Sequence, residues 1–100
     1  MREKAEFTIT AKGSNEHPTL TVEIETTYSL RFNDLLKTNL RHGEERAWDP
    51  EKVRWRVSRD ALDKAVDCAI ACFRKVYLNE GDKVTDCITG QSYENLNLFA

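Results

Sequence analysis

Hydrophobic and polar residues alternate over residues 6–12 and again over residues 20–25 of the chain. A period of two places successive side chains on opposite faces of an extended strand, so each run predicts a half-buried β-strand. Residues 13–15, which are glycine, serine and asparagine, have turn chemistry. The pattern therefore predicts a β-hairpin with a long loop, whose polar face is rich in threonine and glutamate.

The period changes to that of a helix in two later segments. Over residues 29–40 apolar residues recur at three- and four-residue steps, and Ser29 or Asn33 is placed to cap the first turn. A clearer amphipathic helix follows Ser58, its N-cap candidate, and is predicted to run to about Lys75. The apolar positions are Phe32, Leu35, Leu36 and Leu40 in the first helix and Leu62, Val66, Ala69, Ile70 and Phe73 in the second.

Between these helices, residues 45–57 predict a second hairpin. Asp49 and Pro50 suit the first two positions of a type I turn. The strand after the turn has an aromatic apolar face and a basic opposite face. The apolar face consists of Val53, Trp55 and Val57, and the basic face of Arg54 and Arg56.

Residues 76–88 predict a further hairpin, and a last turn leads into residues 91–93, which completes the order β-β-α-β-β-α-β-β-β. This order predicts the α+β class, with a two-layer architecture in which an antiparallel sheet has two helices packed on one face. At this length a single domain, residues 1–100, is expected. Residues 94–100 form a tail expected to dock on the domain or on a protein partner, through Leu96, Leu98 and Phe99.

Charge is unevenly distributed along the chain. Fifteen lysine and arginine residues against seventeen acidic residues give a net charge of −2, which does not by itself indicate a nucleic-acid-binding protein. Between Lys52 and Arg59, however, there are four positive charges and no negative one. Because a local basic face can bind a polyanion on an acidic protein, this segment is the first candidate for a binding surface.

The sequence lacks the motifs of common catalytic sites. Its two histidines, His17 and His42, lie in loop-like sequence, and its four glycines form no phosphate-binding loop. No serine or cysteine lies in a nucleophile-elbow pattern. We therefore expect a protein that is not an enzyme and has no cofactor.

Three cysteines, Cys68, Cys72 and Cys87, could in principle join a histidine as metal ligands. Cys68 and Cys72 lie in the middle of the second predicted helix beside its apolar positions, so we interpret them as small core residues and expect no metal site. The odd cysteine count and the charged N-terminus without a signal-peptide core indicate a reducing, cytoplasmic location. No apolar run is long enough to predict a membrane span.

Residues 46–58 allow two interpretations. In the first, Trp48 and Trp55 pack across the hairpin and stabilise it by a few tenths to about 1 kcal/mol, while the arginines are solvated. In the second, the basic face follows a chain of phosphates and an exposed indole stacks on a base. Residue chemistry alone leaves both interpretations open.

The order of these elements resembles the HARP-type domain found beside annealing helicases, and related small modules of SNF2-type and DEAD-type helicases. The resemblance covers residues 19–78, and its most distinctive part is the hairpin. It rests on the apolar strand 20–24, a short helix ending in Leu35-Leu36-Lys37, the turn Trp48-Asp49-Pro50-Glu51 with Trp55, and the helix 60–73. HARP-type domains are similar to the PUR-type fold and bind DNA at junctions of single and double strands. The resemblance therefore implies nucleic-acid binding.

We accordingly predict a small non-catalytic nucleic-acid-binding module for single-strand or junction nucleic acid, with DNA favoured over RNA and with little sequence specificity. The contacts that the resemblance implies are Lys52, Arg54 and Arg56 on phosphates, extended by Arg46 and Arg59, with Trp48 or Trp55 on a base. Arg41 and His42 are second-rank candidates, and Lys37 is an analogue of the helix lysine of the family. The alternative is a protein-interaction module, such as a phage or mobile-element accessory protein that binds a host enzyme. Its surfaces would be the apolar tail and the acidic sheet residues Glu6, Glu23 and Glu25. A homodimer is a third possibility.

Overall fold

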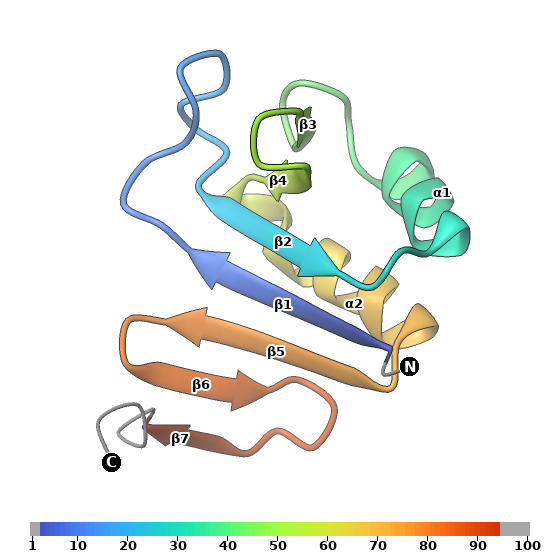
Figure 1. Ribbon diagram of the computed structural model, residues 1–100, viewed down its shortest axis with the longest axis vertical. Coiled ribbons are helices and arrows are strands. Elements are labelled where there is room, and N and C mark those ends of the chain that lie inside the picture. The colour runs from blue at the N-terminus through green and yellow to red at the C-terminus, as the bar shows by residue number, and fades with distance from the viewer. Residues whose placement is uncertain (1–2, 95–100) are drawn as a thin grey trace.

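The structure, a computed structural model, describes residues 3–94, which form one seven-stranded sheet and two α-helices (Figure 1). From edge to edge the strands follow the order β3-β4-β2-β1-β5-β6-β7, so β1 lies in the middle. The predicted α+β class is confirmed. The strands are β1 (Lys4–Ile9), β2 (Val22–Thr26), β3 (Arg46–Asp49), β4 (Arg54–Val57), β5 (Lys75–Glu80), β6 (Lys83–Asp86) and β7 (Ser92–Glu94).

Both helical segments begin at a serine that the sequence marks as a cap. Ser29 Oγ accepts a hydrogen bond from the Phe32 amide at 3.1 Å and precedes α1 (Leu30–Asn39). Ser58 Oγ accepts one from the Ala61 amide at 3.2 Å. It precedes a 3-10 turn, η1 (Arg59–Ala61), which leads directly into α2 (Leu62–Cys72). These side-chain caps satisfy amides that have no partner within the helix.

One strand pair departs from the predicted antiparallel sheet. β1 and β5 pair in parallel, with Phe7 opposite Leu78, whereas the other five pairs among residues 3–94 are antiparallel. β4 also runs parallel to β1, because β2 is antiparallel to both. η1 and α2 therefore supply the crossover that two strands of the same direction need. The prediction that the second helix runs to about Lys75 is wrong for a related reason, because Lys75 already pairs with Lys4 in the parallel ladder.

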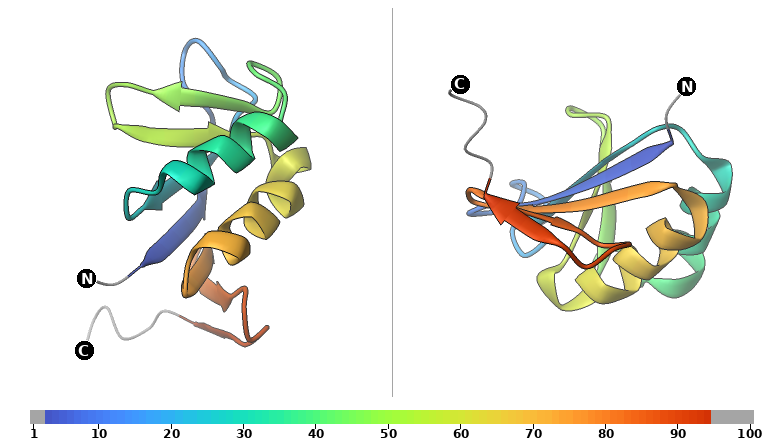
Figure 2. Two further views of the ribbon diagram at one scale, coloured as in Figure 1. Left: turned by 90° about the vertical axis from the view of Figure 1, so that its right-hand side faces the viewer. Right: turned by 90° about the horizontal axis from the view of Figure 1, so that it is seen from below.

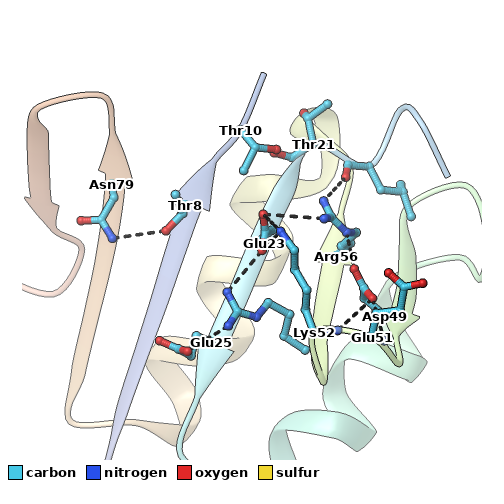
Figure 3. Close-up of polar contacts among 12 residues, drawn as sticks. Thr8, Thr10, Thr21, Glu23, Glu25, Asp49, Glu51, Lys52, Arg56 and Asn79 are labelled. Carbon is cyan, nitrogen blue, oxygen red and sulfur yellow. Dashed lines mark hydrogen bonds and ion pairs between the residues drawn. The ribbon is translucent and has the colours of Figure 1, made fainter. Parts of the chain in front are cut away.

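Both helices lie on the same side of the sheet, as the two views in Figure 2 show. The buried core lies between the helices and this face of the sheet, and its largest side chains include Phe7, Ile24, Phe32, Leu36 and Phe73. The other face carries mainly polar and charged side chains, many of them drawn in Figure 3. We call it the open face. It is the face on which three of the predicted binding cations, Lys52, Arg54 and Arg56, lie.

Among residues 3–94 no helix has both the length and the apolar character needed to cross a bilayer. The predicted apolar tail, with Leu96, Leu98 and Phe99, lies outside the described residues. Docking through that tail therefore stays a prediction.

Candidate functional site

The β3–β4 hairpin places its two indoles on one face and the β4 arginines, Arg54 and Arg56, on the other. In the register of the strands Trp48 lies opposite Trp55, and Ala47 lies opposite Arg56. Successive side chains of a strand point to opposite faces of the sheet, so Arg54 and Arg56 share the open face. The two tryptophans lie on the side of the helices.

Trp48 and Trp55 differ in what surrounds them. Trp55 is buried, and its Nε1 donates a hydrogen bond to Asn33 Oδ1 of α1 at 2.9 Å. The Trp48 ring packs edge to face on Trp55, with centroids 5.4 Å apart and planes at 80°, but Trp48 remains 47% exposed. The guanidinium of Arg46 lies 5.9 Å from the centroid of the Trp55 ring. Trp55 is therefore a core residue, and Trp48 is the indole that a ligand can reach.

The predicted phosphate-binding cations are held in ion pairs on the open face (Figure 3). We call this group the ion cluster; its members are the cations Lys52, Arg54 and Arg56 and the carboxylates Glu23, Glu25 and Asp49. Glu23 lies at its centre and is 8% exposed. Its carboxylate lies 3.3 Å from Lys52 Nζ and 3.2 Å from Arg54 Nη1. Arg54 Nη2 also lies 3.1 Å from Glu25 Oε2.

Arg56 is the most enclosed cation of the ion cluster, at 5% exposed. Its Nε donates a hydrogen bond to Asp49 Oδ2 at 2.9 Å, and its Nη2 lies 3.6 Å from Glu23 Oε2. Its Nη1 donates to the Leu20 carbonyl at 3.4 Å. Three cations and three carboxylates give the ion cluster a formal charge of zero, so the predicted basic face has no excess positive charge.

The other predicted cations lie on different surfaces and also have partners. Their partners are Glu80 for Arg59 (2.9 Å), Glu44 and Glu45 for Arg41 (3.3 and 3.5 Å), and the Leu40 carbonyl for Arg46 (3.0 Å). Arg41 and Arg59 line a separate hollow of about 320 Å³. Its other charged lining residues, Glu44, Glu45 and Asp60, are acidic. Lys37 and His42 are exposed. The structure therefore divides the predicted site residues among several surfaces.

The protonation of Asp49 makes the contribution of the ion cluster to folding stability depend on pH. The hydrogen bond from Arg56 holds the pKa of the Asp49 carboxyl below its usual value, against the opposing effect of burial. The amides of Lys52 (3.2 Å) and Glu51 (3.1 Å) donate to Asp49 Oδ1 and lower this pKa further. A carboxylate whose pKa is lowered by folding stabilises the folded state when it is charged.

We therefore expect the free energy of unfolding to fall in acid. The contribution of Asp49 is fully present above its unfolded pKa of about 3.9 and is lost as the pH falls through the lower folded value. Urea unfolding from near-neutral pH to about pH 2 should show this decline, and Asp49→Asn should show a smaller one. Some decline should remain in the variant, because the Arg41 amide lowers the pKa of Glu45 as well. Equal declines in wild type and Asp49→Asn would show that Asp49 does not contribute to the loss of stability in acid.

A hollow lies at the turn end of the hairpin, on the edge of the helical side. It has a volume of about 230 Å³, and Tyr28, Trp48 and Val53 are its exposed apolar lining residues. Tyr28 is 78% exposed and Val53 is 70% exposed. The charged lining residues, Glu25 and Arg54, are paired at 3.1 Å, so the lining has no net charge. We call this site the aromatic hollow.

Val53 lines the aromatic hollow in a strained conformation. Its φ of 55° is in the left-handed region, and within residues 3–94 no other residue except glycine has a positive φ. For a β-branched residue this conformation is an outlier. The prediction that Val53 is an inward-facing strand residue is wrong, because β4 begins at Arg54 and Val53 belongs to the turn. Sequence reasoning also missed Tyr28, since no local pattern marks a loop tyrosine that the β2–α1 connection carries to the hairpin.

Replacing Val53 by glycine should stabilise the protein by about 1 kcal/mol. The left-handed conformation costs a non-glycine residue roughly 1–2 kcal/mol, and the greater freedom of glycine in the unfolded chain offsets about 0.5–1 kcal/mol of the gain. Urea unfolding measures the difference. The matched control is Gly81→Ala in the β5–β6 turn, at φ 60°, where a loss of similar size is expected. A Val53→Gly protein less stable than wild type would show that the valine makes contacts that stabilise the fold.

The three cysteines lie apart from both the ion cluster and the aromatic hollow. Cys68 is buried, and Cys72 and Cys87 are partly buried. Burial raises the pKa of the Cys68 and Cys87 thiols, so their reactive thiolate form is disfavoured. Among residues 3–94 no three histidine, cysteine or acidic side chains are grouped in a way that could hold a metal ion.

No protein-family model matches the sequence, no curated protein matches it, and no solved structure matches the fold. The resemblance to HARP-type domains therefore stays a prediction.

Proposed function

We propose that this chain is a non-catalytic protein-interaction module that binds a segment of a partner protein at the aromatic hollow. The observation that carries the proposal is the exposure of Tyr28, Trp48 and Val53 around one hollow. Exposed aromatic and aliphatic side chains gathered at one place are typical of interaction sites. Val53 supports the same proposal. Its left-handed backbone costs stability, and its exposed side chain offsets little of that cost by burial. Backbone strain of this kind is typical of binding sites.

The charges near the hollow favour a protein partner over a nucleic acid. Non-specific nucleic-acid binding depends on cations that are available to neutralise phosphates. Lys52, Arg54 and Arg56 already pair with carboxylates, and the whole chain carries a net charge of −2. A phosphate that binds these cations on the open face would have to displace the carboxylate of Glu23 or Asp49 from them.

Selection of a phage-displayed library of random short peptides on the full chain tests the proposal. Enriched peptides should bind Tyr28→Ala at least about 10-fold more weakly than wild type, because the ring forms part of the binding surface. The fold should be unaffected, since Tyr28 is 78% exposed. Ile88→Ala is the matched control, because Ile88 is an exposed apolar residue between β6 and β7, at the other edge of the sheet. The proposal fails if no peptide is enriched, or if enriched peptides bind Tyr28→Ala as well as wild type.

Binding of single-strand or junction DNA is the second candidate, and the exposed Trp48 ring is the observation that favours it. Bases stack on aromatic rings without sequence preference, and the resemblance to HARP-type domains has the same implication. Titration of labelled single-strand, duplex and forked oligonucleotides at two salt concentrations tests this candidate. Binding that weakens steeply with salt, and weakens more in Lys52→Glu than in Lys83→Glu, would support it. Absence of binding at low salt would reject it.

A further inference from the structure

The backbone of Trp48 faces the free edge of the sheet. The Ser58 amide donates to the Glu45 carbonyl at 3.0 Å, so these two residues form a hydrogen-bonded pair at the end of the β3–β4 ladder. Antiparallel ladders alternate hydrogen-bonded and non-hydrogen-bonded pairs, which makes the pair of Trp48 and Trp55 a non-hydrogen-bonded one. The N–H and C=O groups of Trp48 therefore point away from β4, and within residues 3–94 no other strand pairs with that side of β3.

On both sides of Trp48, the backbone at this edge is not available to pair with an added strand. On one side the Arg46 amide donates to the Arg41 carbonyl at 3.1 Å, and the Arg46 carbonyl accepts from the Gly43 amide at 2.8 Å. On the other side the next outward-facing position is Pro50, which has no N–H group. An added strand could therefore pair through its backbone with one residue of β3 only. Such a short edge protects against open-ended pairing between molecules.

Within the proposed function, on which this inference rests, we propose that the partner is a short, extended and uncharged segment of a protein. One of its residues exchanges backbone hydrogen bonds with Trp48, and an apolar side chain of the same segment enters the aromatic hollow. Addition of an extended peptide to a sheet edge, with side-chain pockets for specificity, is a common mode of peptide recognition. Here the edge supplies a single pairing position, so most of the affinity comes from the side chain in the hollow.

The electrostatics of the hollow argue for an uncharged segment. Glu25 and Arg54 are the charged lining residues, and they neutralise each other at 3.1 Å. A carboxylate or ammonium group from a partner would lose hydration on entering and would find no unpaired opposite charge. An apolar or aromatic side chain would instead pack against Tyr28, Val53 and the exposed part of the Trp48 ring.

The test uses an enriched peptide, synthesised with blocked termini, and the full chain. Methylation of its backbone nitrogens, one position at a time, should weaken binding by about 10-fold or more at one position, because that residue loses its hydrogen bond to Trp48. Replacing its apolar anchor by glutamate or by lysine should weaken binding to a similar extent. Hydrogen exchange of the Trp48 amide should slow on binding, whereas the Ser92 amide on the opposite edge strand, β7, should exchange as before.

The outcomes separate this inference from the proposed function. Suppose that the enriched peptides lose affinity for Tyr28→Ala, as the proposed function requires. The inference is still overturned if they tolerate methylation at every position, if they leave the exchange of the Trp48 amide unchanged, or if their anchor is charged. The proposed function would then stand without the inference. Peptides that bind Tyr28→Ala and Val53→Asp as tightly as wild type would overturn both. Loss of affinity in both variants, together with one sensitive methylation position and slowed exchange at Trp48, would support both.

Discussion

Replacing Arg56 by alanine should lower the free energy of unfolding by about 3 kcal/mol, the lower end of the range for breaking a buried ion pair. Arg56 is almost completely enclosed and binds Asp49, Glu23 and the Leu20 carbonyl. Its removal leaves the enclosed Asp49 carboxylate without a cation. Glu23 keeps Lys52 and Arg54, which is why we expect the lower end of the range.

The matched control for this change is Arg59→Ala. Arg59 also makes an ion pair at 2.9 Å, to Glu80, but both side chains are more than half exposed. Exposed pairs contribute about 0–1 kcal/mol, so the two arginine variants should differ clearly in urea unfolding. Equal and small losses would show that the ion cluster is solvated in solution, and the predicted basic face would then again be available to phosphates.

Phe32→Ala should cost about 3–5 kcal/mol, the usual loss for truncating a buried phenylalanine. Phe32 projects from α1 into the core, is fully buried and packs edge to face on Phe73, with ring centroids 5.3 Å apart. Because a domain of this size is stable by only about 5–15 kcal/mol, this loss is a large share of the free energy of unfolding. Circular dichroism during urea unfolding would measure the shift.

Leu30→Ala is the control for Phe32→Ala, because Leu30 lies on the same helix but is largely exposed. Its truncation should change the free energy of unfolding by less than about 0.5 kcal/mol. A loss at Phe32 that is no greater than the loss at Leu30 would contradict the packing of α1 on the sheet.

The ion cluster changes the interpretation of the basic segment. Between Lys52 and Arg59 the sequence contains cations and no carboxylate, which is typical of a phosphate-binding surface. In the folded chain every cation of that segment lies beside a carboxylate from another element or from the hairpin itself. Carboxylates brought close by the tertiary structure therefore neutralise the local excess of positive charge. The aromatic hollow, whose lining has no net charge, is the better candidate for a binding site.

Local patterns predicted the helical and strand segments, though not all of their ends, and the two sides of β4. The period-two runs became β1, β2 and β4, the period of the helices became α1 and α2, and Ser29 and Ser58 are the caps. These features follow from side-chain direction and capping within a few residues, which do not depend on the rest of the fold. The same reasoning separated Trp48 and Trp55 from Arg54 and Arg56.

Long-range pairing settled what those local patterns left open. Glu23 contacts Arg54, 31 residues later, because β2 lies between β1 and β4. The local sequence of neither strand predicts that the two strands are neighbours. The parallel pair of β1 and β5 depends on the crossover through α2, and the aromatic hollow depends on Tyr28 meeting the hairpin turn. A residue's own neighbours in the chain determine which face it occupies, whereas strand order determines which charge or ring lies beside it. That is why the cations could be assigned to a face from the sequence, but their neutralisation could not.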